Sequence, residues 1–259
     1  MDNKFKSMNQ NDKKRDLDTI KEMAFQGDPN SQTQLGIAFA NGSGVTQSYV
    51  EAFKWYKKAA EQGDSDSQNN LGILYYNGQG VMQSYEEAVR WLKKAAEQGN
   101  CHAQKSLGYL YANGQKVTQS YEEAVKWYKK AAEQGDSDSQ NNLGILYYNG
   151  QGVMQSYEEA FKWYKKAAVQ GNYVAEYNLG MLYYNGYGVP QTFEVAAIWI
   201  KKSAIQGYLN AKYIMGTMLF NGQGTYKSFF EAKLWLEAAA EKGHTEAKEF
   251  LKEYLNIIK

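Results

Sequence analysis

The sequence predicts an all-α protein, a solenoid of six two-helix repeats with a capping helix at each end. Three observations lead to this fold class: tryptophan recurs every 36 residues, glycine is confined to four positions of the same period, and apolar residues between the glycines follow helical spacing. The tryptophans are Trp55, Trp91, Trp127, Trp163, Trp199 and Trp235. Such self-similarity indicates an array in which each repeat packs on its neighbours.

The first helix of a repeat is clearest over residues 67–77. Leu71 and Leu74 recur there at helical spacing and form a buried face. Gly78 follows the last periodic residue, where a glycine in the left-handed conformation ends a helix. Gly72 lies mid-helix, where glycine costs roughly 1 kcal/mol relative to alanine. Its recurrence therefore predicts a close approach of the two helices beside the tryptophan.

The second helix begins after Ser84 and ends at Gly99. Ser84 is a good N-cap residue, and Glu87 three residues later has the spacing of a capping box. On the outer face we expect the ion pair Glu86–Arg90 at i, i+4. The same spacing recurs as Glu122–Lys126 and Glu158–Lys162. Each such pair stabilises a helix by only about 0.2–0.5 kcal/mol, so these charges predict a solvated face.

The two ends of the array have the pattern of caps. One helix precedes the first repeat and stops at Gly27 without a tryptophan, and the other has Lys252 at the place of the mid-helix glycine. Terminal repeats of a solenoid need such polar outer faces. We expect a disordered tail over residues 1–15 and a single domain over 16–259, with a capping helix at 16–27, repeats at 28–243 and a capping helix at 244–259. These parts contain fourteen helices.

The composition excludes several classes of protein. Lys+Arg number 29 against Asp+Glu 28 in 259 residues, which argues against a nucleic-acid binder. No apolar run reaches the roughly 18–20 residues of a membrane span, and the first twenty residues lack the apolar stretch of a signal peptide. The single cysteine, Cys101, fits a reducing compartment. The sequence therefore predicts a cytoplasmic protein, which we expect to be a monomer.

The repeat unit is most complete between residues 143 and 171. Its recurring residues there are Leu143-Gly144, Tyr147, Asn149-Gly150, Gly152-Val153, Tyr157, Ala160, Trp163-Tyr164, Lys166-Ala167-Ala168 and Gly171. This pattern resembles the Sel-one-like repeat (SLR) family, a relative of the tetratricopeptide repeat, over about residues 16–259. The resemblance implies a right-handed αα-superhelix that acts as an adaptor in protein complexes.

Candidates for catalysis are few. Cys101 and His102 are neighbours at the start of a helix, where their side chains point about 100° apart and do not form a nucleophile–base pair. The other histidine, His244, is four repeats away, and a zinc site needs three or four ligands. The paired carboxylates Glu86 and Glu87 have the pattern of exposed charges, since nothing there would bury them. We therefore expect no enzyme activity, no metal and no cofactor.

The candidate binding surface lies on the first helices, which in two-helix solenoids line the concave side. Opposite their buried stripe the sequence places aromatic and amide side chains with little charge, suited to stacking and to hydrogen bonds with a peptide backbone. We call these the ladder residues: Asn69, Asn70, Ile73, Tyr76, Asn77, Lys105, Tyr109, Asn141, Asn142, Ile145, Tyr148, Asn149, Tyr177, Asn178, Met181, Tyr184, Tyr213 and Phe220.

Two patterns in the ladder allow alternative interpretations. Asparagine occupies the position of Asn77 in all six repeats, either to grip the main chain of a ligand or because asparagine before glycine suits a helix end. Residues 54–88 are identical to residues 126–160, either through recent duplication or as two equal subsites.

The function predicted from these features is a non-enzymatic protein–protein interaction scaffold that binds a peptide or protein segment in its concave groove. One alternative is a bacterial immunity or adaptor protein that clamps a toxin or secretion partner. A second is an SLR-type hydrolase acting on cell-wall or β-lactam substrates, although the cysteine-rich relatives to which that activity is ascribed differ from a chain with one cysteine. A third is a structural module without a ligand.

Overall fold

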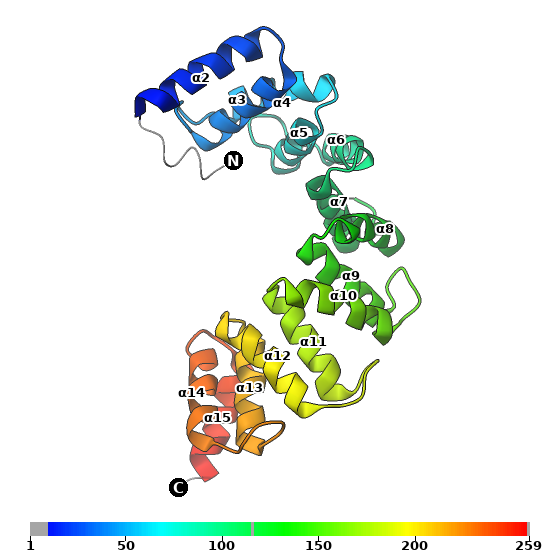
Figure 1. The fold of residues 1–259 in the computed structure, drawn as a ribbon, viewed down its shortest axis with the longest axis vertical. Helices are drawn as coiled ribbons and strands as arrows, with labels where there is room; N and C mark the ends of the chain where they lie inside the picture. Colours follow the sequence, from blue (N-terminus) through cyan, green and yellow to red (C-terminus); the bar gives the residue numbers. More distant parts are fainter. Residues whose placement is uncertain (1–9, 115–116, 258–259) are drawn as a thin grey trace. The chain divides into compact units, whose positions relative to one another are not determined.

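The computed structural model describes residues 10–114 and 117–257. Within these ranges the chain forms fourteen α-helices and no strand, as Figure 1 shows, so the predicted all-α solenoid is confirmed. The helices are α2 (Gln10–Phe25), α3 (Pro29–Asn41), α4 (Tyr49–Glu61), α5 (Ser65–Asn77), α6 (Tyr85–Glu97), α7 (Cys101–Asn113), α8 (Tyr121–Glu133), α9 (Ser137–Asn149), α10 (Tyr157–Val169), α11 (Tyr173–Asn185), α12 (Phe193–Ile205), α13 (Leu209–Asn221), α14 (Phe229–Ala240) and α15 (Thr245–Ile257).

The chain divides into two compact units, unit 1 over residues 1–130 and unit 2 over residues 131–259. Within each unit, a first helix packs against the second helix of its own repeat, and that helix packs against the first helix of the next repeat. The pairs α5–α6 in unit 1 and α9–α10 in unit 2 show this arrangement. The prediction that residues 16–259 form a single domain stays a prediction.

The helix ends follow from the residues that flank them. A carboxylate oxygen of Asp64 accepts a hydrogen bond from the Ser67 N–H at 2.7 Å, and Gly78 ends α5 in the left-handed conformation with φ 69°. The Ser84 hydroxyl caps α6 by accepting from the Glu87 N–H at 3.3 Å, as predicted. The capping box is not completed, because the Ser84 N–H donates to the carbonyl of Tyr75 instead.

The outer ion pairs differ from the predicted ones. Arg90 donates to the Glu87 carboxylate at 2.6 Å rather than pairing with Glu86, so the spacing is i, i+3. The same carboxylate accepts from the indole N–H of Trp91 at 3.2 Å. Glu87 is therefore held between two donors on the next turn, which explains why it does not cap the helix. The pairs Glu51–Lys54, Glu123–Lys126 and Glu159–Lys162 repeat this spacing.

The mid-helix glycines allow the predicted close approach of helices, but the partner is not the tryptophan. A Cβ atom on Gly72 would lie 2.8 Å from Cγ of Leu92 and 3.1 Å from the carbonyl oxygen of Ala88. Leu92 is the residue that follows Trp91. Trp91 instead packs in a cluster that includes Tyr56 on α4, so the tryptophan joins one repeat to the preceding one.

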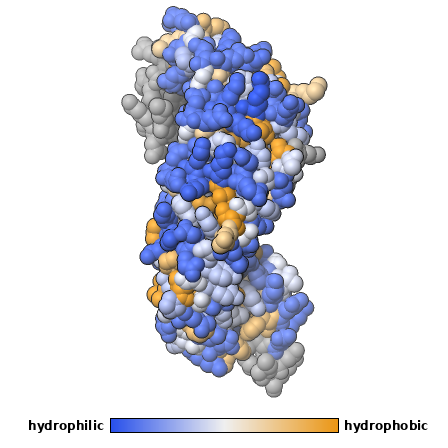
Figure 2. Space-filling view, turned by 90° about the vertical axis from the view of Figure 1, so that its right-hand side faces the viewer, coloured by the Kyte–Doolittle hydropathy of each residue, from blue (hydrophilic) through white to orange (hydrophobic). Residues whose placement is uncertain are grey.

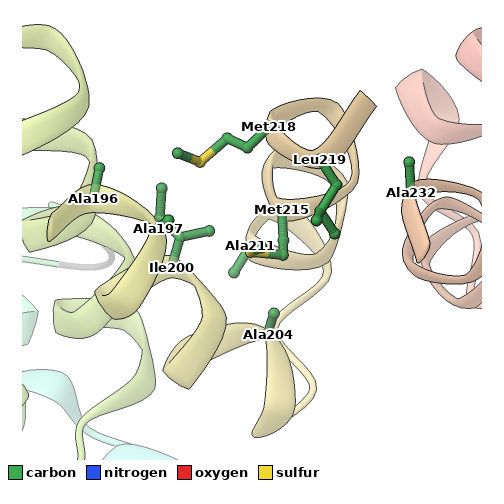
Figure 3. Packing of buried hydrophobic residues seen from close by; sticks show 9 residues of the cluster. All are labelled: Ala196, Ala197, Ile200, Ala204, Ala211, Met215, Met218, Leu219 and Ala232. Atoms are coloured by element: carbon green, nitrogen blue, oxygen red, sulfur yellow. The ribbon is translucent and has the colours of Figure 1, made fainter. Parts of the chain in front are cut away.

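A buried cluster in unit 2 shows how three helices share a core. In Figure 3, Ala196 and Ile200 on α12 lie near Met215 and Met218 on α13, and Ala232 on α14 belongs to the same cluster. The alanines let the helix backbones come close, and the methionines fill the space that remains.

The capping helices are present with shifted ends. Helix α2 begins at Gln10, six residues before the predicted start at residue 16, so residues 10–15 are helical rather than part of a tail. Residues 1–9 of the predicted tail lie outside the described residues. Helix α15 matches the predicted C-terminal cap, and Nδ1 of His244 accepts a hydrogen bond from the Ala247 N–H at 3.2 Å.

Candidate functional site

In unit 1 the ladder residues lie on α5 and α7. Ile73 is 37% exposed and Tyr109 is 49% exposed, which is unusual for large apolar side chains and makes them the centre of this face. Tyr76 is half-buried because its ring packs edge-on against Tyr85, with the ring centroids 5.4 Å apart. Asn77 is exposed at the helix end. Asn70 and Lys105 are half-buried beside them.

In unit 2 the ladder residues lie on α9, α11 and α13, and their rings pack against aromatic residues outside the ladder. Tyr148 packs on Tyr157, and Tyr157 stacks on Tyr187 with centroids 4.8 Å apart. Tyr148 is also near Tyr187, at 6.2 Å. Burial raises the pKa of the Tyr148 phenol, and the two neighbouring tyrosines add to this effect. The phenol therefore stays neutral at physiological pH and remains a hydrogen-bond donor.

The other rings of unit 2 contact residues on later helices or in the segments beside them. The Tyr184 hydroxyl donates to the amide oxygen of Gln223 at 3.1 Å, and the Tyr184 ring packs on Phe193. Tyr177 packs on Tyr208 at 5.2 Å, and burial raises the pKa of the Tyr177 phenol. Further pairs are Tyr213 with His244, and Phe220 with Phe229 and Phe250. Asn142, Ile145, Asn178 and Met181 are half-buried, and Asn149 is exposed.

Asn69 and Asn141 were expected on the open surface, and this expectation is wrong. Each is only 6% exposed, because residues of the following repeat cover it. Asn178 donates to the amide oxygen of Asn141 at 3.0 Å, which joins α11 to α9. Asn141 therefore joins adjacent first helices, whereas the side-chain amide of Asn69 donates to the amide oxygen of Asn70 on its own helix, at 3.4 Å.

The two identical blocks differ in the neighbours that they meet. The Ser67 hydroxyl lies 2.7 Å from the Thr33 hydroxyl, whereas the Ser139 hydroxyl has no hydrogen-bond partner within the described ranges. The amide oxygen of Asn69 also has none there, because Ser106 occupies the place that Asn178 has beside Asn141. Identical sequence therefore meets different buried neighbours in the two blocks, and the interpretation of two equal subsites stays a prediction.

Replacement of Ser106 by asparagine should complete the missing bond. We expect Ser106→Asn to raise the free energy of unfolding by about 1 kcal/mol, because a buried acceptor gains a donor at the spacing seen between Asn178 and Asn141. Hydrogen exchange of the α5 amides in unit 1 measures this. The matched control is Asn178→Ser, which should lower protection of α9 by a similar amount. A Ser106→Asn chain with unchanged protection of α5 would contradict the explanation.

The asparagines before the C-terminal glycines make hydrogen bonds close to their own helix ends. Asn113 and Asn185 donate to the carbonyl oxygens four residues earlier, those of Tyr109 at 3.0 Å and Met181 at 2.9 Å. Asn77 donates to the side chain of Gln79 at 3.3 Å. The bonds of Asn113 and Asn185 satisfy carbonyl groups at their helix ends, as the helix-end interpretation expects, whereas the bond of Asn77 leaves both interpretations open.

The candidate catalytic residues stay apart from one another or have structural roles. Cys101 is half-buried and His102 is exposed on adjacent positions of α7. His244 stacks on Tyr213 and hydrogen-bonds Asn210 at 3.1 Å in addition to capping α15. In the described ranges, no group of three His, Cys, Asp or Glu side chains could hold a metal ion. None of the helices described there is long and apolar enough to cross a bilayer.

One buried carboxyl departs from the repeat pattern. Gln68 and Gln140 donate to the carbonyl oxygens of Ala60 and Ala132 at 3.1 and 3.0 Å, which ties each first helix to the preceding second helix. Glu176 occupies this position in repeat five and is 4% exposed, with Gln206 donating to it at 2.8 Å. Burial raises the pKa of Glu176, an effect that this hydrogen bond and the Lys202 charge partly oppose.

Replacement of Glu176 by glutamine should stabilise unit 2 in a pH-dependent manner. Because the folded state holds the proton more tightly than the unfolded state, wild-type stability falls as pH rises through the raised pKa of Glu176. The gain from Glu176→Gln should therefore be small at acidic pH and reach about 1 kcal/mol at pH 7. Urea unfolding of both chains across this range measures it. A gain that shrinks as pH rises would contradict the sign.

Sequence reasoning missed the residues that back the ladder. Tyr157, Tyr187 and Tyr208 contact ladder tyrosines, and Gln223 accepts from Tyr184. Tyr187 gives a usable signal, because serine or glutamine stands at its position in the other repeats. Tyr157 gives none, since tyrosine is common at its position and its spacing indicates the inner side of a second helix.

Comparison with known proteins agrees with this architecture. The sequence profile of the Sel1 repeat family matches residues 29–64, 65–100, 101–136, 137–172, 174–208 and 209–244. The chain is similar to a protective antigen of uropathogenic Escherichia coli with an SLR fold, at 37% identity and a TM-score of 0.87, covering 91% of this chain and 50% of that one. It is also similar to a Sel1 repeat protein from Oxalobacter formigenes, at 35% identity and a TM-score of 0.73, covering 83% and 86%.

This chain thus spans about half the length of the Escherichia coli antigen. No curated protein matches the chain. The six profile matches fall on the six helix pairs seen in the structure and cover most of the sequence. The chain belongs to the Sel1 repeat family.

Proposed function

We propose that the chain is a non-enzymatic scaffold that binds an extended segment of a partner protein along the exposed faces of its first helices. The Sel1 repeats support a role in protein interaction. The observation that carries the proposal is the row of exposed and half-buried rings and amides on α5 and α7 in unit 1 and on α9, α11 and α13 in unit 2. Large apolar side chains left in water on such a face support binding.

The chemistry of this face fits a polypeptide main chain. Asparagine amides both donate and accept hydrogen bonds, as backbone groups do, and tyrosine rings cover apolar side chains while their hydroxyls stay available. Lys105 is the one charged ladder residue. A segment of low charge therefore suits the face better than an acidic or basic tail.

The rings of unit 2 are set in place before a partner arrives. Tyr148 is held by Tyr157 and Tyr187, and Tyr184 by Phe193 and Gln223. Side chains that are already ordered lose less conformational freedom on binding, which supports affinity. In unit 1, Ile73 and Tyr109 are more exposed and offer apolar contact area instead.

The experiment compares partner capture by matched charge insertions. Tagged wild-type chain is purified from cells that express it, and co-purified proteins are quantified by mass spectrometry. Ile73→Glu/Tyr109→Glu places charge on the first-helix face at exposed positions, so the fold should persist. We expect the variant to lose the wild-type partner, because carboxylates would be desolvated against a segment of low charge. Overlapping peptides of that partner then locate the bound segment.

The control is Val50→Glu/Met82→Glu, which adds the same charges at exposed positions on the second-helix side and in a loop. It should retain the partner. Equal capture by wild type, variant and control, with equal melting temperatures, would show that the first-helix face does not bind the partner.

A further inference from the structure

The outer faces of the second helices in unit 2 carry exposed apolar side chains. Five aliphatic or aromatic side chains on α10, α12 and α14 are between 50% and 74% exposed. We call them the outer apolar stripe: Val169, Ile198, Ile205, Phe230 and Leu234. They lie on second helices and are separate from the first-helix face described above. On the side of the molecule that Figure 2 shows, hydrophobic patches interrupt a largely hydrophilic surface.

Two members of the stripe replace cations. In the first four repeats this position carries the lysine or arginine of an i, i+3 ion pair, at distances of 2.6–3.2 Å: Lys54–Glu51, Arg90–Glu87, Lys126–Glu123 and Lys162–Glu159. Ile198 and Leu234 occupy the same position in repeats five and six. The solvated ion pair is therefore lost where the apolar side chain appears.

Two other members replace glutamates and leave lysines behind. In repeat one, Lys57 pairs with Glu61 at i, i+4, 3.8 Å away. Val169 and Ile205 stand at the position of Glu61 in repeats four and five. Lys165 and Lys201, at the position of Lys57, consequently make no ion pair within the part of the chain that the structure describes. Two lysines therefore lie beside the apolar side chains without an ion-pair partner in the described ranges, and Nζ of Lys165 lies 5.8 Å from the centroid of the Phe161 ring.

The members of the stripe share helix faces or equivalent repeat positions. Ile198 and Ile205 are seven residues apart on α12, and Phe230 and Leu234 are four apart on α14, so each pair shares one face of its helix. Ile198 and Leu234 hold equivalent positions on consecutive second helices. Single exposed aliphatic residues are normal on protein surfaces, but several of them on three successive second helices are typical of an interaction site.

We propose that the outer apolar stripe docks an amphipathic helix of a partner protein, with its apolar face on the stripe and acidic residues against Lys165 and Lys201. Exposed aliphatic side chains complement the apolar face of an amphipathic helix, and the cations beside them complement acidic residues that flank that face. The acidic residues supply the counter-charge that Glu61 provides in repeat one.

The charges around the stripe favour a helix over a lipid surface. Glu158 and Glu194 are exposed on α10 and α12, and the exposed Glu241 directly follows α14. A flat anionic membrane would meet these carboxylates together with the lysines, whereas a narrow helix can meet the lysines alone. A second copy of this chain is also a poorer occupant. Its stripe carries the same mixed charges and so has no excess of carboxylates to pair with Lys165 and Lys201.

The test measures fluorescence anisotropy of a labelled synthetic helix. The probe carries leucine at i, i+3, i+4 and i+7 and glutamate on its flanks, and a second peptide has lysine in place of every glutamate. We expect the wild-type chain to bind the acidic peptide at least about tenfold more tightly than the basic one, with affinity that falls as salt is added. Equal binding of both peptides, or of neither, would overturn the proposal.

Two double variants place the binding on the stripe. Ile198→Lys/Ile205→Glu restores the charges that repeats one to three have at these exposed positions, and it should weaken acidic-peptide binding about tenfold. Lys54→Ile/Glu61→Ile transplants the pattern to repeat one and should create a second binding event. Unchanged stoichiometry and affinity in both variants would overturn the proposal.

Two further measurements test whether a membrane or a second copy of the chain, rather than a partner helix, covers the stripe. The chain is incubated with vesicles of phosphatidylcholine, with and without phosphatidylglycerol, and sedimented, and its own mass is measured by analytical ultracentrifugation. We expect no co-sedimentation and a monomer. Vesicle binding that Ile198→Lys/Ile205→Glu abolishes would show a membrane surface instead, and a dimer that it dissociates would show a second copy; either result overturns the proposal.

Discussion

Replacement of Trp91 by alanine is expected to lower the free energy of unfolding by about 3–5 kcal/mol. The ring is 5% exposed and packs in a cluster with residues of α4 and α5, and its indole N–H donates to Glu87. Truncation therefore leaves a cavity between two repeats and removes one of the donors to the Glu87 carboxylate, which keeps Arg90. Urea unfolding monitored by far-UV circular dichroism measures the loss.

The loss should stay local, because each repeat of a solenoid contacts only its neighbours. Hydrogen exchange of the Trp91→Ala chain should show reduced protection in α4, α5 and α6 and little change in unit 2. Trp91→Phe is the matched control and should cost less, since it keeps part of the ring. Protection lost evenly over all described helices would contradict the locality.

Replacement of Gly80 by alanine is expected to cost roughly 2–5 kcal/mol, from a backbone clash added to strained dihedral angles. Gly80 has φ 71°, and a Cβ atom there would lie 2.2 Å from the carbonyl oxygen of Tyr49. That oxygen belongs to the backbone at the start of α4, so the neighbouring repeat has to move. Thermal unfolding of unit 1 measures the effect.

Gly63→Ala is the matched control for Gly80→Ala. Gly63 has φ 98°, but no heavy atom outside its immediate chain neighbours lies within 4 Å of the place that its Cβ atom would take. Its substitution therefore carries the dihedral strain alone, about 1–2 kcal/mol. Equal losses for the two variants would show that the contact with Tyr49 contributes nothing.

The fold was predictable because tryptophan and glycine mark every repeat at a fixed place. The period does not say which side chain faces Gly72, however, because Trp91 and Leu92 are adjacent on α6 and only the packed helices decide that Leu92 does. In the same way, Glu86 and Glu87 both lie within reach of Arg90 by spacing. The additional bond from Trp91 selects Glu87.

The candidate site was predictable in its chemistry and less so in its exposure. Ile73 and Tyr109 lie in the open as expected. Asn69 and Asn141 do not, because burial there depends on side chains of the following repeat, one period away in sequence. Tyr148 belongs to a three-ring group through Tyr187, a residue that the pattern of one repeat does not contain.

The hydroxyl pair of Thr33 and Ser67 bears on how the gene for this chain can change in length. Unequal exchange between the two identical blocks would delete residues 54–125 in frame and join repeat one to repeat four. Thr33 would then precede Ser139 as it now precedes Ser67, and it would give that hydroxyl the 2.7 Å partner seen at Ser67. A shortened protein of four repeats would thus keep a packing interface between repeats that the longer protein already has. The number of repeats can therefore change without a new interface having to evolve.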